Sequence, residues 1–289
     1  MHPTDAVRAS VRPPLRRRLS MLLTAALTVG LVTAASPIPA AGATATGTAD
    51  GTTATDTADG TTTRILASMN AGRTAYGLVP YQAWSALGAL AAERAARMAA
   101  VGRLSHDIAG DDIGESLTLR GIGWMGYGEI IARSPFPFGT AAADNVYEMW
   151  MASPPHRSIM LSGIYNYVGI GTAQSADGTT WVAAMMTESR DHTAPVARSR
   201  SLARSGRDVT FTWAGFDPRL QTHTAGLRSF DVQARRDGGS WRTVRDNTTG
   251  TRAVFPDRAR GHWYGFRVQA ADRRGTLSRW TSEIRIWVP

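Results

Sequence analysis

The chain has 289 residues, a net charge of +9 and no cysteine. This length is enough for about two domains. The lack of cysteine excludes disulfides, so hydrophobic cores must provide the stability. All 32 basic residues are arginine, which we interpret first as the coding bias of a GC-rich bacterial genome.

Residues 1–43 are typical of a secretory signal peptide. A run of arginines ending at Arg18 precedes an apolar stretch at 21–35 and a small-residue site at 41–43. This order predicts cleavage near Ala43, by the general or the twin-arginine export route. The apolar stretch is shorter than the roughly 20 residues that cross a bilayer, and no later segment is suitable. We therefore expect a secreted protein, extracellular or associated with the cell wall, without a transmembrane segment in the mature chain.

Residues 44–63 are rich in threonine, alanine, aspartate and glycine, and the sequence TADGTT occurs in them twice. Because this segment has no large apolar side chain to bury, we expect a flexible linker. Ordered structure is expected to begin near Ile65.

The segment 64–191 predicts a first domain with helices at its start. A first helix is expected from about Ile65 to a point before Gly77. Apolar residues then recur every three or four positions through an alanine-rich segment from Trp84 to Gly102, which predicts a second helix. A glycine-rich, acidic loop is expected next, and a third helix is expected at about 141–152.

Two strands are expected after the third helix, at 165–172 (YNYVGIGT) and 180–186, joined by a turn at Ala176-Asp177-Gly178. Between helix and strand, residues 153–155 (SPP) are predicted to break the helix and leave His156 in a loop. Helices followed by a small antiparallel sheet indicate an α+β domain.

The segment 192–289 has the alternating pattern of short strands that is typical of a β-sandwich. Strands are expected at 209–213, 229–234, 241–244, 264–270 and 283–288. From Pro195 onward, the chain has eighteen arginines and eight acidic residues, which gives a net charge of +10. An anionic envelope polymer or lipid is a partner that this charge would attract; a solvated surface with no partner is the alternative. Nucleic acid is not expected outside the cell.

Four titratable residues of the first domain are candidates for a site: His106, Glu129, Glu148 and His156. Two histidines and a carboxylate are suitable ligands for a divalent cation such as zinc, and they equally suit an acid/base pair. Their spacing matches no local metal motif, and a histidine near a helix end often only contacts the last carbonyls. Glu148 lies off the apolar stripe of its helix, so it faces solvent or a cleft.

Several motifs of the first domain occur in one order: NAGRTAYGLVPY at 70–81, the alanine-rich helix ending in LSH at 104–106, GEI at 128–130, and WMASPPHRSIML with YNYVGIG at 150–171. This ordered set resembles the CAP superfamily of cysteine-rich secretory proteins, venom antigens and plant pathogenesis-related proteins, in its bacterial secreted branch. The resemblance covers about residues 65–188.

The resemblance implies an α-β-α sandwich with a central cleft that holds two histidines and two glutamates, and in several members a divalent cation. His106 and His156 match the two histidines and Glu129 the first glutamate. Ser153 stands where the second glutamate commonly lies, so Glu148 is only a substitute candidate. Ile130 replaces the usual asparagine, and Val182 and Ala183 follow Trp181 where bacterial members tend to carry Thr-Gln.

The second domain resembles a fibronectin type III domain, an immunoglobulin-like β-sandwich, over about residues 193–289. The resemblance implies that Trp213 fills the core between the sheets. It also implies that Tyr264 fixes a corner by a hydrogen bond to the backbone.

Three functions are consistent with these features. The first is a non-enzymatic binder of a small amphipathic or lipid ligand or an envelope polymer, with a divalent-metal cleft as an option and no catalytic residue assigned. The second is a metal-dependent hydrolase in which His106 and His156 hold the metal and Glu129 is the general base. The third is a structural or adhesive spacer at the cell surface. The lack of G-x-S-x-G and H-E-x-x-H motifs favours the first.

Overall fold

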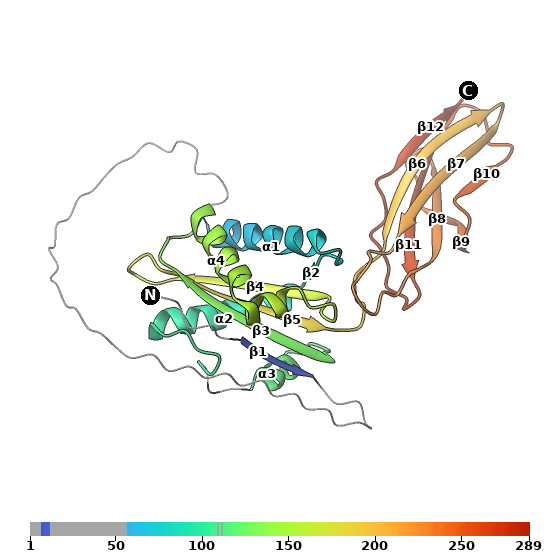
Figure 1. Ribbon diagram of the computed structural model, residues 1–289. Helices are drawn as coiled ribbons and strands as arrows, with labels where there is room; N and C mark the ends of the chain where they lie inside the picture. Colours follow the sequence, from blue (N-terminus) through green and yellow to red (C-terminus); the bar gives the residue numbers. More distant parts are fainter. Residues whose placement is uncertain (1–6, 12–56, 109, 111) are drawn as a thin grey trace, which may run out of the picture. The chain divides into compact units, whose positions relative to one another are not determined.

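Residues 7–11, 57–108, 110 and 112–289 are described by the computed structural model, shown in Figure 1. The chain divides into two units, unit 1 at Met1–Ser189 and unit 2 at Arg190–Pro289. The sequence analysis places this boundary two residues later, between residues 191 and 192. The expected cleavage site near Ala43 lies outside the described residues. Within those residues, no helix is both long and apolar enough to cross a membrane.

Unit 1 contains a five-stranded sheet in the order β1-β3-β5-β4-β2. Its strands are β1 (Val7–Val11), β2 (Gln82–Ala83), β3 (Gly126–Ser134), β4 (Tyr167–Gln174) and β5 (Thr180–Glu188). Neighbouring strands are antiparallel except for β2 and β4, which are parallel. The predicted pair of strands is confirmed as the hairpin of β4 and β5.

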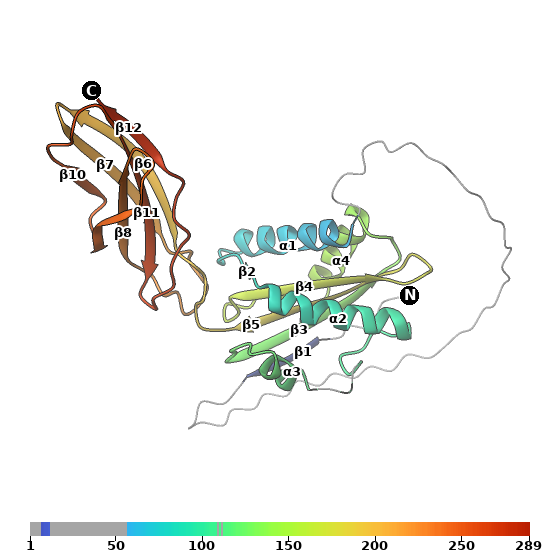
Figure 2. The ribbon, with the colours of Figure 1, turned by 180° about the vertical axis from the view of Figure 1, so that it is seen from behind.

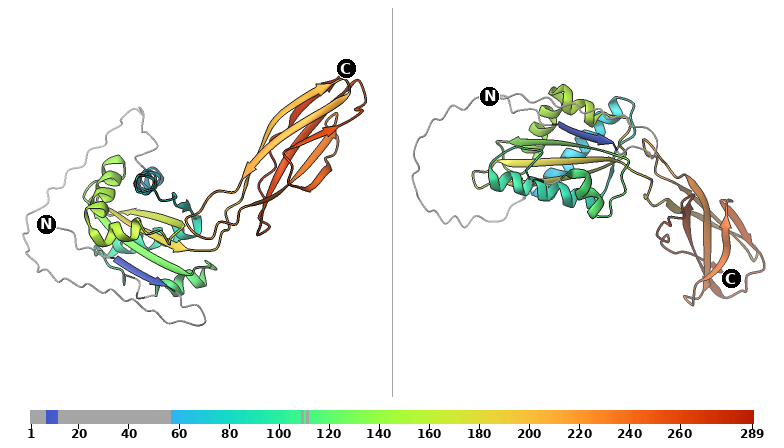
Figure 3. Two further views of the ribbon diagram at one scale, coloured as in Figure 1. Left: turned by 45° about the vertical axis from the view of Figure 1, so that its right-hand side comes forward. Right: turned by 90° about the horizontal axis from the view of Figure 1, so that it is seen from below.

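Helices cover both faces of this sheet (Figures 2 and 3). They are α1 (Ala58–Ala75), α2 (Ser85–Val101), α3 (Ile113–Leu119), α4 (Thr140–Ala152) and α5 (Pro154–Met160). Side chains of α1, α4 and α5 share one core with Ile130, Val182 and Ala184 of the sheet. Helix α2 packs on the opposite face, beside Gly169 and Gly171 of β4. The domain is therefore an α+β domain, with the helix, sheet and helix layers expected from the sequence.

Helix α2 forms where the apolar periodicity predicts it. Leu87, Ala91, Ala95 and Met98 are fully buried along one side. The helix ends at Gly102, which adopts the left-handed conformation (φ 68°) and donates its N–H to the Met98 carbonyl. Its periodic face is thus the one that meets the sheet.

Helix α1 begins at Ala58, so the expectation of a linker through residue 63 is wrong. The Thr57 side chain caps the helix by accepting from the Gly60 N–H at 3.0 Å. Thr61 is fully buried, and its hydroxyl accepts from the Gly139 N–H at 2.8 Å. Capping and a tertiary contact therefore order a segment that has too few apolar residues to be recognised by hydrophobicity.

The described part of unit 1 contains five elements that the sequence did not predict: β1, β2, β3, α3 and α5. Pro154 and Pro155 begin α5 rather than introduce a loop, because proline suits the first turn of a helix, where its missing N–H is not needed. Ser153 both ends α4 and precedes α5. The expectation that His156 lies in a loop is therefore wrong: it lies in the first turn of α5.

Strand β1 falls inside the expected signal peptide and pairs with β3, with Val7 opposite Ile130. Strand β1 is the edge strand of the sheet beside β3. Cleavage near Ala43 would remove β1 and leave β3 at the edge.

Unit 2 consists of two antiparallel sheets. One has the order β10-β7-β6 and the other β12-β11-β8-β9. The strands are β6 (Val196–Ser205), β7 (Asp208–Phe216), β8 (Leu227–Arg236), β9 (Arg242–Thr248), β10 (Arg252–Phe255), β11 (His262–Asp272) and β12 (Ile284–Val288). All five expected strands are present. Strands β6 and β10, which the sequence did not predict, complete the smaller sheet.

The core of unit 2 lies between its two sheets, as an immunoglobulin-like sandwich requires. Trp213 is 2% exposed and packs edge to face with Phe230 of the other sheet. The Tyr264 hydroxyl donates to the Ala259 carbonyl at 3.3 Å. Both structural roles implied by the resemblance are therefore seen.

Candidate functional site

Glu129 is the buried acid at the centre of the candidate site. It lies on β3, and its side chain is fully buried. Successive residues of a strand point to opposite faces, and Glu129 projects toward α2, while a side chain at Gly128 would project toward α5. An ionised carboxylate in such a place requires charged or hydrogen-bonding partners.

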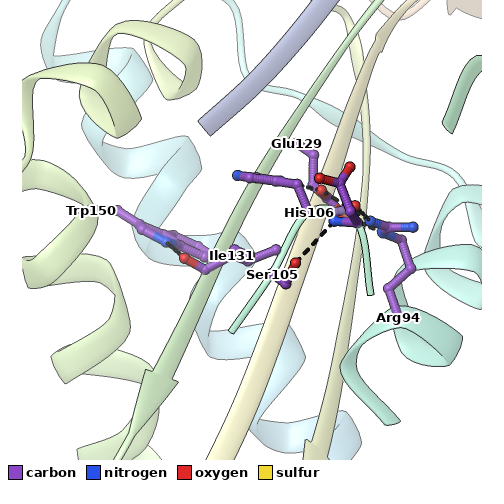
Figure 4. Close-up of polar contacts among 7 residues, drawn as sticks. Arg94, Ser105, His106, Glu129, Ile131 and Trp150 are labelled. Atoms are coloured by element: carbon purple, nitrogen blue, oxygen red, sulfur yellow. Dashed lines mark hydrogen bonds and ion pairs between the residues drawn. The ribbon is translucent and has the colours of Figure 1, made fainter. Parts of the chain in front are cut away.

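Arg94 of α2 is the first of these partners (Figure 4). Its side chain is 2% exposed, and its Nε donates to Glu129 Oε1 in a buried ion pair. Its Nη2 donates to the backbone carbonyl of His106 and lies 3.4 Å from Glu129 Oε2. One guanidinium therefore neutralises the acid and also holds the loop that carries the histidine.

His106 is the second partner of Glu129. Its Nδ1 is hydrogen-bonded to Glu129 Oε2. Because an ionised carboxylate can only accept, Nδ1 is the donor. The other ring nitrogen, Nε2, is buried without a hydrogen-bond partner among the described residues. The carboxylate thus fixes the ring, and Nε2 is the atom of the cluster with unused hydrogen-bonding capacity.

The loop around His106 is held from both ends. At its start, the Arg103 N–H donates to the Met98 carbonyl of α2 at 3.2 Å. After the histidine, the Asp107 N–H donates to Ser105 Oγ at 3.1 Å. Together with the bond from Arg94, these contacts define the position of His106 against β3.

His156 lies elsewhere in the unit. It is 4% exposed, and its Nδ1 is 2.8 Å from Ser153 Oγ. Helix α5 packs on the face of β3 opposite to Glu129, since a Cβ at Gly128 would lie 3.0 Å from Ile159 Cγ2. The serine that stands where the family commonly has a carboxylate is therefore a partner of His156.

Glu148 is exposed on α4, which decides between the two positions that the helix pattern allowed. It faces solvent. Among the four candidates, His106 and Glu129 are in direct contact with each other.

The residue that sequence reasoning missed is Arg94. One signal was present: Arg94 lies four residues after Leu90 and four before Met98, on the buried side of α2. A charged residue within an apolar helical stripe needs a buried partner of opposite charge, and Glu129 is that partner.

A divalent cation does not fit the cluster as its side chains lie. Both oxygens of Glu129 are occupied, one by a guanidinium and one by an imidazole, and a cation bound there would lie next to the positive charge of Arg94. Within the described ranges, no group of three histidine, cysteine, aspartate or glutamate residues is placed to hold a metal. The ligand set of His106, Glu129 and His156 stays a prediction.

A sequence model of the CAP family, described as the cysteine-rich secretory protein family, matches residues 66–185. No curated protein matches the chain. Among solved structures, an extracellular protein containing an SCP domain from Bacillus anthracis is 19% identical, with a TM-score of 0.39, 45% of this chain covered and 41% of the other.

Two further solved structures are similar to separate parts of the chain. An outer surface protein from Borrelia burgdorferi is 14% identical, with a TM-score of 0.41, 45% of this chain covered and 93% of the other. A Fn3-like protein from Clostridium thermocellum is 24% identical, with a TM-score of 0.26, 34% of this chain covered and 96% of the other.

Proposed function

Because residues 66–185 form a CAP domain of the cysteine-rich secretory protein family, we propose that this chain is an exported protein that binds an envelope ligand without chemically changing it. The ligand class is a small amphipathic or lipid molecule or an envelope polymer. Export is proposed from the signal-peptide pattern of residues 1–43. The attraction to anionic envelope components is proposed from the net charge of +10 from Pro195 onward.

One observation supports binding over catalysis: both carboxylate oxygens of Glu129 are hydrogen-bonded, one to Arg94 and one to His106. A hydrolase of the kind considered above needs Glu129 as a free general base, within reach of a metal-bound water. Both oxygens of Glu129 are already hydrogen-bonded, so neither is free to accept a proton from such a water. The cluster is therefore better suited to holding the loop of His106 in place.

The binding test uses the mature chain, beginning after Ala43. It would be incubated with purified bacterial cell walls and with lipid vesicles, at low and at high salt, and the retained fraction measured. We expect retention at low salt on at least one of the two, weakened by salt in proportion to its electrostatic part. No retention on either at low salt would contradict the proposal and leave the spacer function.

A calorimetric zinc titration tests the hydrolase alternative and the metal prediction together. Wild type would be compared with His106→Ala and His156→Ala, and with His223→Asn as a control in unit 2. Asparagine tolerates the positive φ of 60° at residue 223. We expect no zinc binding that depends on His106 or His156. Stoichiometric binding that is lost in both of these variants and kept in the control would favour the hydrolase.

A further inference from the structure

The outer face of the β12-β11-β8-β9 sheet in unit 2 carries an unusual set of side chains. Along β11, Tyr264, Phe266 and Val268 point into the core. The alternate residues, Trp263, Gly265 and Arg267, therefore point outward. Trp263 pairs with Trp287 of β12, and Gly265 lies between Arg285 of β12 and Arg235 of β8.

Indoles and guanidiniums alternate across part of this face. The Arg267 guanidinium lies 4.8 Å from the ring centroid of Trp280 and 4.2 Å from that of Trp241. Arg235 continues the row at 4.5 Å from Trp241. These distances are within the range of cation–π interaction, so the indoles and guanidiniums hold one another in fixed positions.

Gly265 leaves room for a neighbouring side chain to cross the middle of the face. A Cβ there would collide with the carboxylate of Glu283, which crosses the strand to form an ion pair with Arg235. Burial and, secondarily, the charge of Arg235 lower the pKa of Arg267. Arg235 and Arg267 therefore lie close enough on this face for their charges to repel each other.

The most exposed part of the face consists of Trp263, Trp287 and Arg285. The two indoles are 46% and 41% exposed, with ring centroids 5.6 Å apart. The Arg285 guanidinium lies 5.6 Å from the Trp263 ring, and among the described residues it makes no ion pair within 4 Å. A row that served only to stabilise the sheet would have no need of two exposed indoles and an exposed arginine at its end.

The chemistry of this surface selects one class of partner. Flat indoles present an apolar plane to the C–H face of a sugar ring, and guanidiniums form paired hydrogen bonds with carboxylate or phosphate. The surrounding unit has a net charge of +10 from Pro195 onward, which complements an acidic polymer. A membrane-binding surface separates its apolar side chains from its cationic ones, whereas indoles and guanidiniums lie next to each other on this face.

We infer that this outer face, centred on Trp263, Trp287 and Arg285, binds an anionic polysaccharide, with sugar rings stacked on the indoles and acidic groups paired with the guanidiniums. The inference rests on the proposed envelope binding but assigns it to unit 2 rather than to the His106 cluster. Retention on cell walls and the effect of the variants below are separate measurements, so either can fail alone.

The test measures binding of the mature chain to polygalacturonate, whose rings each carry a carboxylate. Dextran supplies rings without charge, polyphosphate supplies charge without rings, and phosphatidylglycerol vesicles supply an anionic lipid surface. We expect polygalacturonate to bind most tightly. Trp263→Ala, Trp287→Ala and Arg285→Glu should each weaken that binding by about tenfold, the loss typical of a residue central to an interface.

Matched controls are available on the other sheet. Phe216→Ala removes an aromatic side chain that is 47% exposed, and Arg252→Glu makes the same charge change as Arg285→Glu at an exposed position of β10. Both should stay within about twofold of wild type. Trp263→Phe, which keeps an aromatic ring, should lose less than Trp263→Ala, and thermal unfolding would check that each variant is folded.

Three results would overturn the inference. Equal losses in Arg252→Glu and Arg285→Glu would show diffuse electrostatic attraction. Binding to polyphosphate or to the vesicles that matches polygalacturonate, with no effect of the tryptophan variants, would remove the role of the sugar ring. Cell-wall retention that is unchanged in all three face variants would leave the proposed function standing and refute this surface.

Discussion

Arg94 and Glu129 form a buried ion pair between helix and sheet in unit 1, with side chains 2% and 0% exposed. Such a pair stabilises little relative to apolar residues of the same size, but the loss of one partner leaves an uncompensated charge in the interior. The main effect of the pair is therefore on the specificity of the fold: through Arg94, it determines that the loop of His106 lies against β3.

Replacement of Arg94 by methionine should lower the free energy of unfolding of unit 1 by ~3–5 kcal/mol, because Glu129 would be left buried without its ion-pair partner. The double variant Arg94→Met/Glu129→Leu should recover much of this loss. Urea unfolding of both single variants and the double variant measures the coupling. Arg97→Met, on the exposed side of the same helix, should change stability by less than about 0.5 kcal/mol. A double variant as unstable as the sum of the singles would show that the two residues are not coupled.

Asp217 is a second carboxylate in an unfavourable environment. Burial raises its pKa above the ordinary value of 3.8, the charges of Asp191 and Asp272 add to the rise, and a hydrogen bond from the Gly226 N–H opposes it. Asp191 and Asp217 accept from the adjacent N–H groups of Ala225 and Gly226 at 2.7 and 2.6 Å, so the loop brings like charges together.

A raised carboxyl pKa favours the protonated form in the folded state, so its contribution to stability is present at low pH and is lost as pH rises through the folded pKa. Asp217→Asn removes the ionisable carboxyl, so the variant does not lose this stability as the pH rises. We therefore expect a higher melting temperature of unit 2 at pH 7, with the gain disappearing as the pH falls below about 4. Asp246→Asn on exposed β9 is the control. A gain that is equal at both pH values would contradict the charge explanation.

At the scale of elements, α2 and β4 show how sequence pattern and packing combine. The helix lies so close to the strand that a Cβ at Gly171 would collide with the backbone at Ala91 and Ala92. Gly169 meets the backbone at Leu87 and Gly88 in the same way. The alternate glycines of the motif VGIG therefore serve close helix–sheet packing, which also brings Arg94 within reach of Glu129.

Gly171→Ala should destabilise unit 1 by at least about 2 kcal/mol, because the clash is with backbone and cannot be relieved by a side-chain rotation. Gly123→Ala is the matched control, since a Cβ there meets nothing within 4 Å. Chemical denaturation of both variants provides the measurement. If the two variants lose equal stability, the loss reflects glycine replacement in general and not the packing of α2.

At the scale of the whole molecule, each unit has a hydrophobic core of its own, one built on the unit 1 sheet and one between the sheets of unit 2. Separate cores predict separate cooperative transitions. Differential scanning calorimetry should resolve two of them, with Gly171→Ala lowering only the first unit's melting temperature. Gly215→Ala, whose Cβ would lie 2.6 Å from Phe230 Cε1 and from the Val196 carbonyl oxygen, should lower only that of the second. A single transition shifted by both variants would contradict this independence.

Local patterns in the sequence determined much of this protein. The stripe from Trp84 to Gly102 and the alternation in strands such as β7 and β11 depend on residues three, four or two positions apart, so they can be predicted without the fold. The ordered motifs, through their resemblance to the CAP superfamily, placed His106, Glu129 and His156 in one cleft, whereas the structure joins His106 to Glu129 and holds His156 on α5. The same local reasoning missed α5, where two prolines start a helix, and β6, whose mostly exposed residues give no strong alternation.

Only the tertiary structure decided what the charged residues do. Arg94 and Glu129 are 35 residues apart, and their contact depends on how α2 packs on the sheet and on which pleat of β3 each residue occupies. Because Gly128 faces α5, the next residue, Glu129, points to the other face of the sheet, away from the helix that carries His156. In unit 2, strand register and the alternation of faces put Trp263, Trp287 and Arg285 together on one outer surface. A sequence specifies which groups are charged or aromatic, but the burial of those groups and the choice of their partners arise only when separate elements pack together.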